Sequence, residues 1–213
     1  MSLSLIKQVS HGTIGIWELT EPGRELSKIY DFSVTEINEF NKLKIEKRKK
    51  EYLAVRLLLK KITGSKNEII YNSSGKPYLK DNTLKISISH SDNLAAILLS
   101  KSNAGIDTED TERKIENIAS RFLSKTELEN TLKVENPRRM QIVYWSAREA
   151  AYKCNSELNI NVQTHLKIFP FEFNKEGGKF EGEIYRSGTA SPVFFEYFLY
   201  KNNVIVYCIE DII

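Results

Sequence analysis

The order of elements, helices followed by a strand–turn–strand pattern, occurs in both halves of this chain and limits the folds open to it. In the first half, helical spacing predicts one helix over Glu36–Leu43 and a longer one over Glu46–Ile62, with Gly64 at its end. Alternating apolar and polar residues over Leu84–His90, followed by the apolar segment Leu94–Ser100, indicate a hairpin. We therefore expect mixed helices and antiparallel strands here.

The second half has the same order. A strand ending at Gly105–Glu109 precedes two predicted helices, Ile115–Leu123 and Lys125–Val134. Asn136 then caps a third helix that begins at Pro137 and runs to about Cys154. Four antiparallel strands are predicted after it: Leu166–Phe173, Lys179–Tyr185, Val193–Tyr200 and Val204–Glu210. The sequence predicts an α+β fold, interpreted as a structural duplication with two similar lobes, 1–103 and 104–213.

Composition indicates an ordinary globular protein, because 41% of the residues are apolar and 28% are charged. No apolar run approaches the roughly 20 residues of a membrane span, so no membrane is expected as a partner. The first residues lack the pattern of a secretory signal. Cys154 and Cys208 lack metal-ligand spacing, and two thiols fit a reducing compartment. A cytoplasmic location is expected.

The net charge of +3 conceals a local excess of positive charge. Nine Lys and Arg residues against two Glu residues give Lys42–Lys61 a balance of +7, which leaves −4 for the rest of the chain. Such a confined basic segment favours a local anion site over a nucleic-acid surface. A solvated helix face is the simpler alternative.

Four charged residues in two distant segments suggest metal chemistry. Asp107 and Glu109 alternate in a strand and would face the same way, which is costly unless a cation or solvent relieves their repulsion. Glu149 and Lys153 stand four residues apart on one helix face. Carboxylates from two segments suit Mg²⁺, which prefers oxygen ligands. Taken singly, each pair is also compatible with a solvated strand end or a surface ion pair.

Two further segments carry groups that suit phosphate. His90 lies between two serines at the end of a predicted strand, and all three side chains can donate hydrogen bonds. Gly75, Lys76 and Pro77 form a turn in which a bare backbone beside a lysine would admit a nucleotide. A structural histidine and ordinary turn punctuation are the alternatives.

Together these segments resemble the 4′-phosphopantetheinyl transferase superfamily, in the longer, two-lobed form that activates peptide and polyketide synthetases. The family signature is G-[VI]-D-x-E followed about forty residues later by W-x-x-[KR]-E-[AS]-x-x-K. The matching segments are Gly105–Glu109 and Trp145–Lys153, with corroborating segments at Tyr52–Arg56, Gly75–Pro77, Ser87–Ser91 and Phe122–Glu127. Arg148 stands where lysine is commoner, and Thr108 replaces the usual aliphatic residue.

The resemblance implies Mg²⁺-dependent transfer of 4′-phosphopantetheine from coenzyme A to a serine of an apo carrier protein, which leaves 3′,5′-ADP. It implies two lobes with pseudo-twofold symmetry: 1–103 would bind the nucleotide, and 104–213 would bind the metal and catalyse transfer. Asp107, Glu109 and Glu149 would hold Mg²⁺. Glu149, or a water held at the metal, would take the serine proton, and Lys153 would stabilise the breaking pyrophosphate. The nucleotide would contact Lys50, Arg56, Gly75, Lys76, Pro77, Ser89 and His90.

The implied partners are coenzyme A and an acidic acyl or peptidyl carrier protein, with no nucleic acid. Arg113, Lys114, Arg121 and Lys125 are candidates for a basic rim that steers the carrier. A monomer is expected, because a two-lobed chain supplies its own interface. The alternatives are a non-catalytic module that binds coenzyme A or carrier protein with the same fold, and an unrelated Mg²⁺-dependent phosphotransferase. The second has no P-loop motif to support it.

Overall fold

The computed structural model describes residues 3–155, 162–186 and 188–210. Its strands are β1 (Leu3–Val9), β2 (Gly12–Glu18), β3 (Ile69–Tyr71), β4 (Pro77–Leu79), β5 (Lys85–His90), β6 (Leu94–Ser100), β7 (Ala104–Asp110), β8 (Leu166–Ile168), β9 (Gly178–Arg186), β10 (Thr189–Tyr200) and β11 (Asn203–Ile209). Its helices are α1 (Gly23–Ile29), α2 (Val34–Lys42), α3 (Glu46–Thr63), the 3₁₀ helix η1 (Glu116–Ile118), α4 (Ala119–Phe122), α5 (Lys125–Thr131), α6 (Pro137–Cys154) and α7 (Val162–His165).

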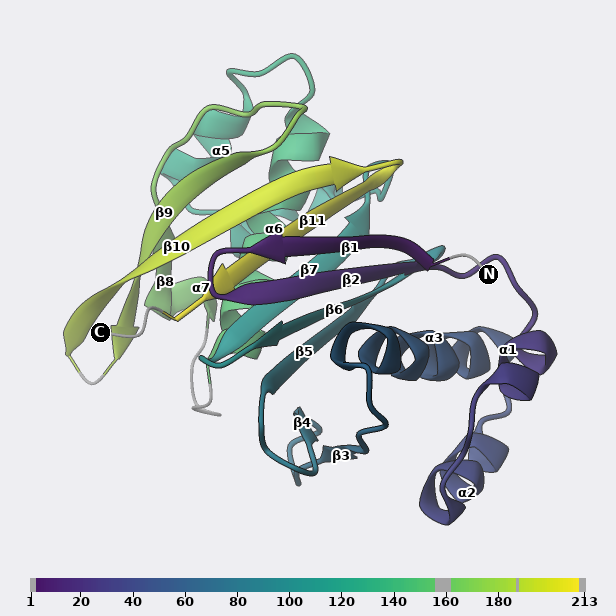
Figure 1. Ribbon diagram of the computed structural model, residues 1–213. Coiled ribbons are helices and arrows are strands. Elements are labelled where there is room, and N and C mark those ends of the chain that lie inside the picture. Colours follow the sequence, from purple (N-terminus) through teal and green to yellow (C-terminus); the bar gives the residue numbers. More distant parts are fainter. Residues whose placement is uncertain (1–2, 156–161, 187, 211–213) are drawn as a thin grey trace.

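The strands form two larger antiparallel sheets with no strand in common (Figure 1). One has the order β1-β2-β6-β5 and the other β7-β11-β10-β9-β8, while β3 and β4 form a separate hairpin. The α+β class is thereby confirmed. The first sheet draws on residues 3–100 and the second on 104–209. The division of the chain at 103/104 and the pseudo-twofold relation remain predictions. None of the described helices is long and apolar enough to span a membrane.

The long helices agree best with the sequence pattern. The third predicted helix of the second half is confirmed from Pro137 to Cys154, with the Asn136 side chain accepting a hydrogen bond from the Arg139 N–H. The predicted helix 115–123 is instead split into η1 and α4, and the predicted strand 166–173 ends at Ile168. Pro170 lacks an N–H for a strand ladder, which explains the early end.

The core has three parts because each sheet is buried on two faces. On the first sheet, one set of residues packs with α3, and the alternate set faces the second sheet. Helix α6 covers the other face of the second sheet, where it packs on β7 and β11. The shared cluster between the sheets contains residues of β2, β6, β7, β10 and β11.

The edges of the two sheets meet at β5 and β7, which lie side by side without a backbone ladder. Ser87 and Ser89 bridge them: their Oγ atoms accept hydrogen bonds from the N–H groups of Ile106 and Thr108, at 3.1 and 3.2 Å. Serine hydroxyls thus replace the carbonyls of a regular partner strand. This junction brings the predicted phosphate-binding strand against the predicted metal-binding strand.

Candidate active site

Asp107 is the centre of a hydrogen-bond network at the junction of the two sheets. Its carboxylate is 5% exposed and accepts a bond from the Ser89 hydroxyl at 2.9 Å. The Lys153 ammonium lies 2.8 Å from the same oxygen, Oδ1, and also donates to Ser89 Oγ and the Ile106 carbonyl, each at 3.0 Å. Three segments distant in sequence therefore converge on one carboxylate oxygen.

Glu109 lies two residues further along β7 and has its own partners. Its Oε1 accepts a hydrogen bond from Trp145 Nε1 at 3.0 Å and pairs with the Arg113 guanidinium. Arg113 in turn lies 5.2 Å from the centre of the Trp145 ring. Burial and the charge of Asp107 raise the pKa of Glu109 to about 7, against the opposing effect of Arg113. This carboxylate therefore resists ionisation until more positive charge is nearby.

Glu149 is half-buried on α6, one turn beyond Trp145. Its pKa is raised by burial and by the negative charge of Asp107, while Lys153 and Arg113 act in the opposite direction. The Asp107 carboxylate thus acts on Glu109 along β7 and on Glu149 across the gap between β7 and α6. The two predicted carboxylate segments are brought into one electrostatic neighbourhood.

This neighbourhood has the chemistry of a hard-cation site. All three side chains are oxygen donors, and Asp107 Oδ2 is buried without a hydrogen-bond partner in the described structure. Within residues 3–155, 162–186 and 188–210, no group of three or more His, Cys, Asp or Glu side chains is already gathered in metal-binding geometry. Asp107 and Glu109 are paired with Lys153 and Arg113 instead. The orphaned oxygen and the mutual repulsion fit a divalent cation, provided that these pairs rearrange.

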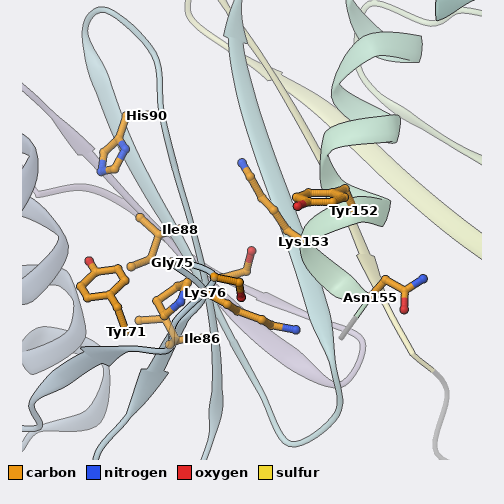
Figure 2. A pocket seen from close by; sticks show the side chains of 12 residues that line it. Tyr71, Gly75, Lys76, Ile86, Ile88, His90, Tyr152, Lys153 and Asn155 are labelled. Carbon is orange, nitrogen blue, oxygen red and sulfur yellow. The ribbon is translucent and has the colours of Figure 1, made fainter. Parts of the chain in front are cut away.

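A cavity of about 290 Å³ opens beside this network. Figure 2 shows Tyr71, Gly75 and Lys76 on one side of it and Tyr152 and Lys153 of α6 on the other. Gly75 has φ +81°, which favours glycine, and nothing lies within 4 Å of where its Cβ would be. Burial lowers the pKa of Lys76. The predicted turn thus faces the predicted pyrophosphate lysine across one cavity. The remaining lining residues are Ser74, Pro77, Ile86, Ser87, Ile88, His90 and Asn155.

His90 lines the same cavity and is surrounded by positive charge. Burial, followed by the charges of Lys153, Arg48 and Lys47, lowers the pKa of His90 to about 4. The imidazole is therefore neutral near pH 7, and a bound anion would favour its protonation. Lys47 also pairs with Asp92 at 2.6 Å, which ties the start of α3 to the loop after β5.

Lys50 and Arg56, the two residues predicted from the basic helix to contact the nucleotide, do not line this cavity. Lys50 donates a hydrogen bond to the Leu19 carbonyl at 3.3 Å and does not line the cavity. Arg56 is 2% exposed, with Nε 3.3 Å from Glu36 and the guanidinium carbon 3.3 Å from the centre of the Tyr52 ring.

Besides Lys153, two basic residues of α3 act on His90, Lys47 and Arg48, and sequence reasoning missed both. Both lie in the first turn of α3, ahead of the apolar stripe that anchors the helix. Helical register relative to that stripe is the signal that could have found them, because Arg56 falls among the buried positions.

Ser89, by contrast, contacts β7. Its hydroxyl joins Asp107, Lys153 and the Thr108 N–H, and it is absent from the cavity lining. Ser89 and His90 face opposite sides of β5, and Ser89 lies on the side that contacts β7.

Arg148 has a structural place beneath the site. Its Nη2 lies 2.9 and 2.8 Å from the two carboxylate oxygens of Glu127, and both side chains are buried. Glu127 also accepts hydrogen bonds from the N–H groups of Ser124 and Ile168. The motif residue at position 148 thus joins α6 to α5 and β8, and does not face the cavity.

Comparison with known proteins agrees with this geometry. A search of curated proteins found no significant match. Residues 103–208, about half of the chain, match the family model described as the 4′-phosphopantetheinyl transferase superfamily. The match covers β7, α6 and the second sheet, which hold all three carboxylates and Lys153. The chain belongs to the 4′-phosphopantetheinyl transferase superfamily.

Proposed function

We propose that this protein is an Mg²⁺-dependent enzyme that transfers 4′-phosphopantetheine from coenzyme A to a serine of an apo carrier protein, releasing 3′,5′-ADP. Membership of the superfamily supports phosphopantetheine transfer as the general function. The observation that carries the finer proposal is the position of Lys153. Its ammonium contacts Asp107 at 2.8 Å and borders the cavity that Gly75, Lys76 and His90 also line.

The first half of the chain would bind the nucleotide end of coenzyme A. The Gly75–Pro77 turn offers exposed backbone and the Lys76 ammonium to the adenylate. His90, supported by Lys47 and Arg48, would contact the 3′-phosphate. The cavity holds only part of so long a ligand, so the pantetheine arm would extend beyond it.

The second half would carry out the transfer. Asp107, Glu109 and Glu149 would hold Mg²⁺, which supplies charge neutralisation for the pyrophosphate oxygens when bound. The raised pKa of Glu149 suits a group that accepts the proton of the carrier serine, directly or through a water. The serine oxygen would bond to the phosphorus of the pantetheine phosphate as the bond from that phosphorus to the ADP oxygen breaks. Lys153 would then pair with the charge that develops on the departing phosphate.

The carrier protein would approach along the segment between the two metal motifs. Lys114, Arg121 and Lys125 are exposed there, and the Lys125 side chain is 91% exposed. Arg113 instead pairs with Glu109, so we assign it to the site and not to the rim. Positive side chains at this edge would steer an acidic carrier. The longer, two-lobed form of the family and a monomeric state also belong to this proposal.

The test is the intact mass of an apo acyl or peptidyl carrier protein incubated with this protein, coenzyme A and Mg²⁺. We expect the carrier to gain one phosphopantetheine, and a chelator to prevent the gain. If coenzyme A binds by calorimetry but no carrier is modified, the non-catalytic module is the better description. Transfer that persists in excess chelator would remove the metal from the proposal.

A further inference from the structure

The two cysteines of the chain, far apart in sequence, are in contact. Cys154 is the last residue of α6, and Cys208 lies on β11. Both are thiols, and a hydrogen bond joins their side chains. Cys208 is 2% exposed, while Cys154 is only partly buried at the edge of the same core cluster.

A glycine makes this contact possible. Gly105 of β7 is paired with Cys208 of β11, so the two residues share a face of the sheet. A Cβ on Gly105 would collide with the Ala150 carbonyl oxygen and lie 2.8 Å from the Cys154 nitrogen. Without that atom, the last turn of α6 settles directly onto β7, and its terminal cysteine reaches the neighbouring strand.

The surroundings of the two thiols give them different roles. Both line a cavity of about 470 Å³ beside β9 and β10, so a small oxidant has a route to the pair. The charge of Lys76 acts on Cys154, and a nearby cation favours the reactive thiolate. The hydrogen bond to Cys154 and burial raise the pKa of Cys208, which keeps this thiol protonated. Cys154 is therefore the thiol that reacts first, and Cys208 the one that resolves.

We propose that Cys154 and Cys208 form a redox-modification site, which a peroxide oxidant converts into a disulfide that clamps the end of α6 to β11. The Cys154 thiolate attacks one peroxide oxygen; an S–O bond forms, the O–O bond breaks, and hydroxide leaves. Cys208, losing its proton, then attacks the sulfenic sulfur; the S–S bond forms and water leaves. The pair loses two electrons to one peroxide, and a dithiol reductant restores both thiols. The clamp restrains the neighbouring Lys153, and this consequence for transfer rests on the proposed function.

The first readout is independent of catalysis. The reduced protein is treated with hydrogen peroxide, alkylated under denaturing conditions, and weighed intact and after digestion. We expect no alkyl groups on the oxidised monomer, a linked peptide containing both cysteines, and two alkyl groups after treatment with dithiothreitol. Two alkylated cysteines after oxidation, an oxyacid on Cys154 alone, or a disulfide-linked dimer would each overturn the proposal.

Two single variants serve as controls. Cys154→Ser and Cys208→Ala should each leave one sulfur that cannot form the link, and thermal unfolding verifies that each variant is folded. If Cys208→Ala does not fold, Cys154→Ser alone suffices, because a link that persists in it contradicts the assignment.

The second readout is transfer to the carrier protein. The disulfide should slow it by about tenfold, since small displacements of a reacting group are costly. Dithiothreitol should restore the rate, and Cys154→Ser should resist peroxide. An unchanged rate of transfer in fully disulfide-linked protein would overturn the clamp on Lys153. If even the reduced protein transfers nothing, the result counts against the proposed function, and the disulfide found by mass spectrometry is unaffected.

Discussion

Helices α3 and α6 occupy corresponding places in the two halves of the molecule. Each has 18 residues. Helix α3 packs on β2 and β6, and α6 packs on β7 and β11. In the first sheet β2 pairs with β6, and β6 pairs with β5. In the second sheet β7 pairs with β11, and β11 pairs with β10. The two halves therefore share the order of three central strands and one long helix, and they differ in the strands outside these.

The two helices are also anchored in the same way. Arg56 of α3 pairs with Glu36, and Arg148 of α6 pairs with Glu127, and all four side chains are buried. In each case the glutamate belongs to the capping box of the preceding short helix, α2 or α5. One carboxylate thus caps one helix and holds the next, in both halves.

The two halves differ in how closely the long helix packs on the strand that contains the glycine, Gly15 in β2 and Gly105 in β7. A Cβ on Gly15 would meet the ends of the Ile62 and Leu58 side chains, at 2.8 and 3.1 Å. At Gly105 the corresponding atom would collide with the backbone of α6 at Ala150. Counting from Arg56 and Arg148, the two α3 residues that face Gly15, Leu58 and Ile62, correspond to the smaller Ala150 and Cys154 of α6, which lets α6 lie closer to its sheet.

Gly15 corresponds to Gly105, and Arg56 corresponds to Arg148. Counting along the strand and the helix from these residues gives the first-half counterpart of each candidate site residue. The three carboxylates of the second half correspond to apolar residues of the first: Trp17 for Asp107, Leu19 for Glu109 and Leu57 for Glu149. One arrangement of elements therefore serves as an apolar core in one place and as a charged site in the other. The close approach of α6 is what brings Glu149 and Lys153 to the carboxylates of β7.

The largest effect is expected at Glu149. In the proposed function Glu149 is both a charged metal ligand and the proton acceptor, so Glu149→Gln should lower the rate of transfer by about a thousandfold while the fold is kept. Leu57→Gln, at the corresponding position of α3, is the matched control and should leave the rate near that of the wild type. Carrier modification followed by mass spectrometry measures both, and retained turnover by Glu149→Gln would remove this residue from the site.

The buried arginines should matter for stability in both halves. Arg148→Met leaves Glu127 buried without its cation, which should lower the free energy of unfolding by about 4 kcal/mol. Arg56→Met should cost a similar amount through Glu36. Urea unfolding measures both losses. A negligible loss in either variant would show that the two helices are not anchored alike.

Substitution of Gly105 and of Gly15 by alanine should lower the stability of the protein by different amounts. Gly105→Ala places a methyl group against rigid backbone and should lower the free energy of unfolding by about 3 kcal/mol, whereas Gly15→Ala only displaces flexible side-chain ends and should cost about 1 kcal/mol. The same urea experiment measures the difference. Equal losses would contradict the closer packing of α6.

The smallest effect is expected at His90, one of the residues that the first half contributes to the cavity lining. His90→Ala should weaken binding of coenzyme A by about tenfold, through one charge-assisted hydrogen bond, and binding of dephospho-coenzyme A less. Calorimetry measures both, and equal losses would show that His90 does not contact the 3′-phosphate.

The pH dependence gives a second check on His90. The pKa of free His90 is lowered to about 4, and a phosphate bound beside it would raise this pKa, so the proposed complex would take up a proton. The preference for coenzyme A over dephospho-coenzyme A should therefore grow as the pH falls from neutrality toward 4, and His90→Ala should abolish this trend. A preference that does not vary with pH in the wild type would contradict the protonation of His90.

Part of the site follows from local sequence. Residues two apart in a strand share a face, so Asp107 and Glu109 were expected to act together, and residues four apart on a helix were expected to place Glu149 beside Lys153. The capped helix Pro137–Cys154 is confirmed, and its start follows from a local signal, the cap Asn136 followed by Pro137. The family signature depends on the same two segments.

Tertiary packing decided the rest. Helical register separates Arg56 from the exposed face of α3, but it does not show that Glu36 and Tyr52 enclose Arg56, or that Lys47 and Arg48 lie near His90. Periodicity places a residue on a face, but the partner of that face lies far away in sequence. The meeting of β5 with β7 through serine hydroxyls, and of α6 with β7 at a glycine, depends on how two sheets pack, which local patterns do not encode.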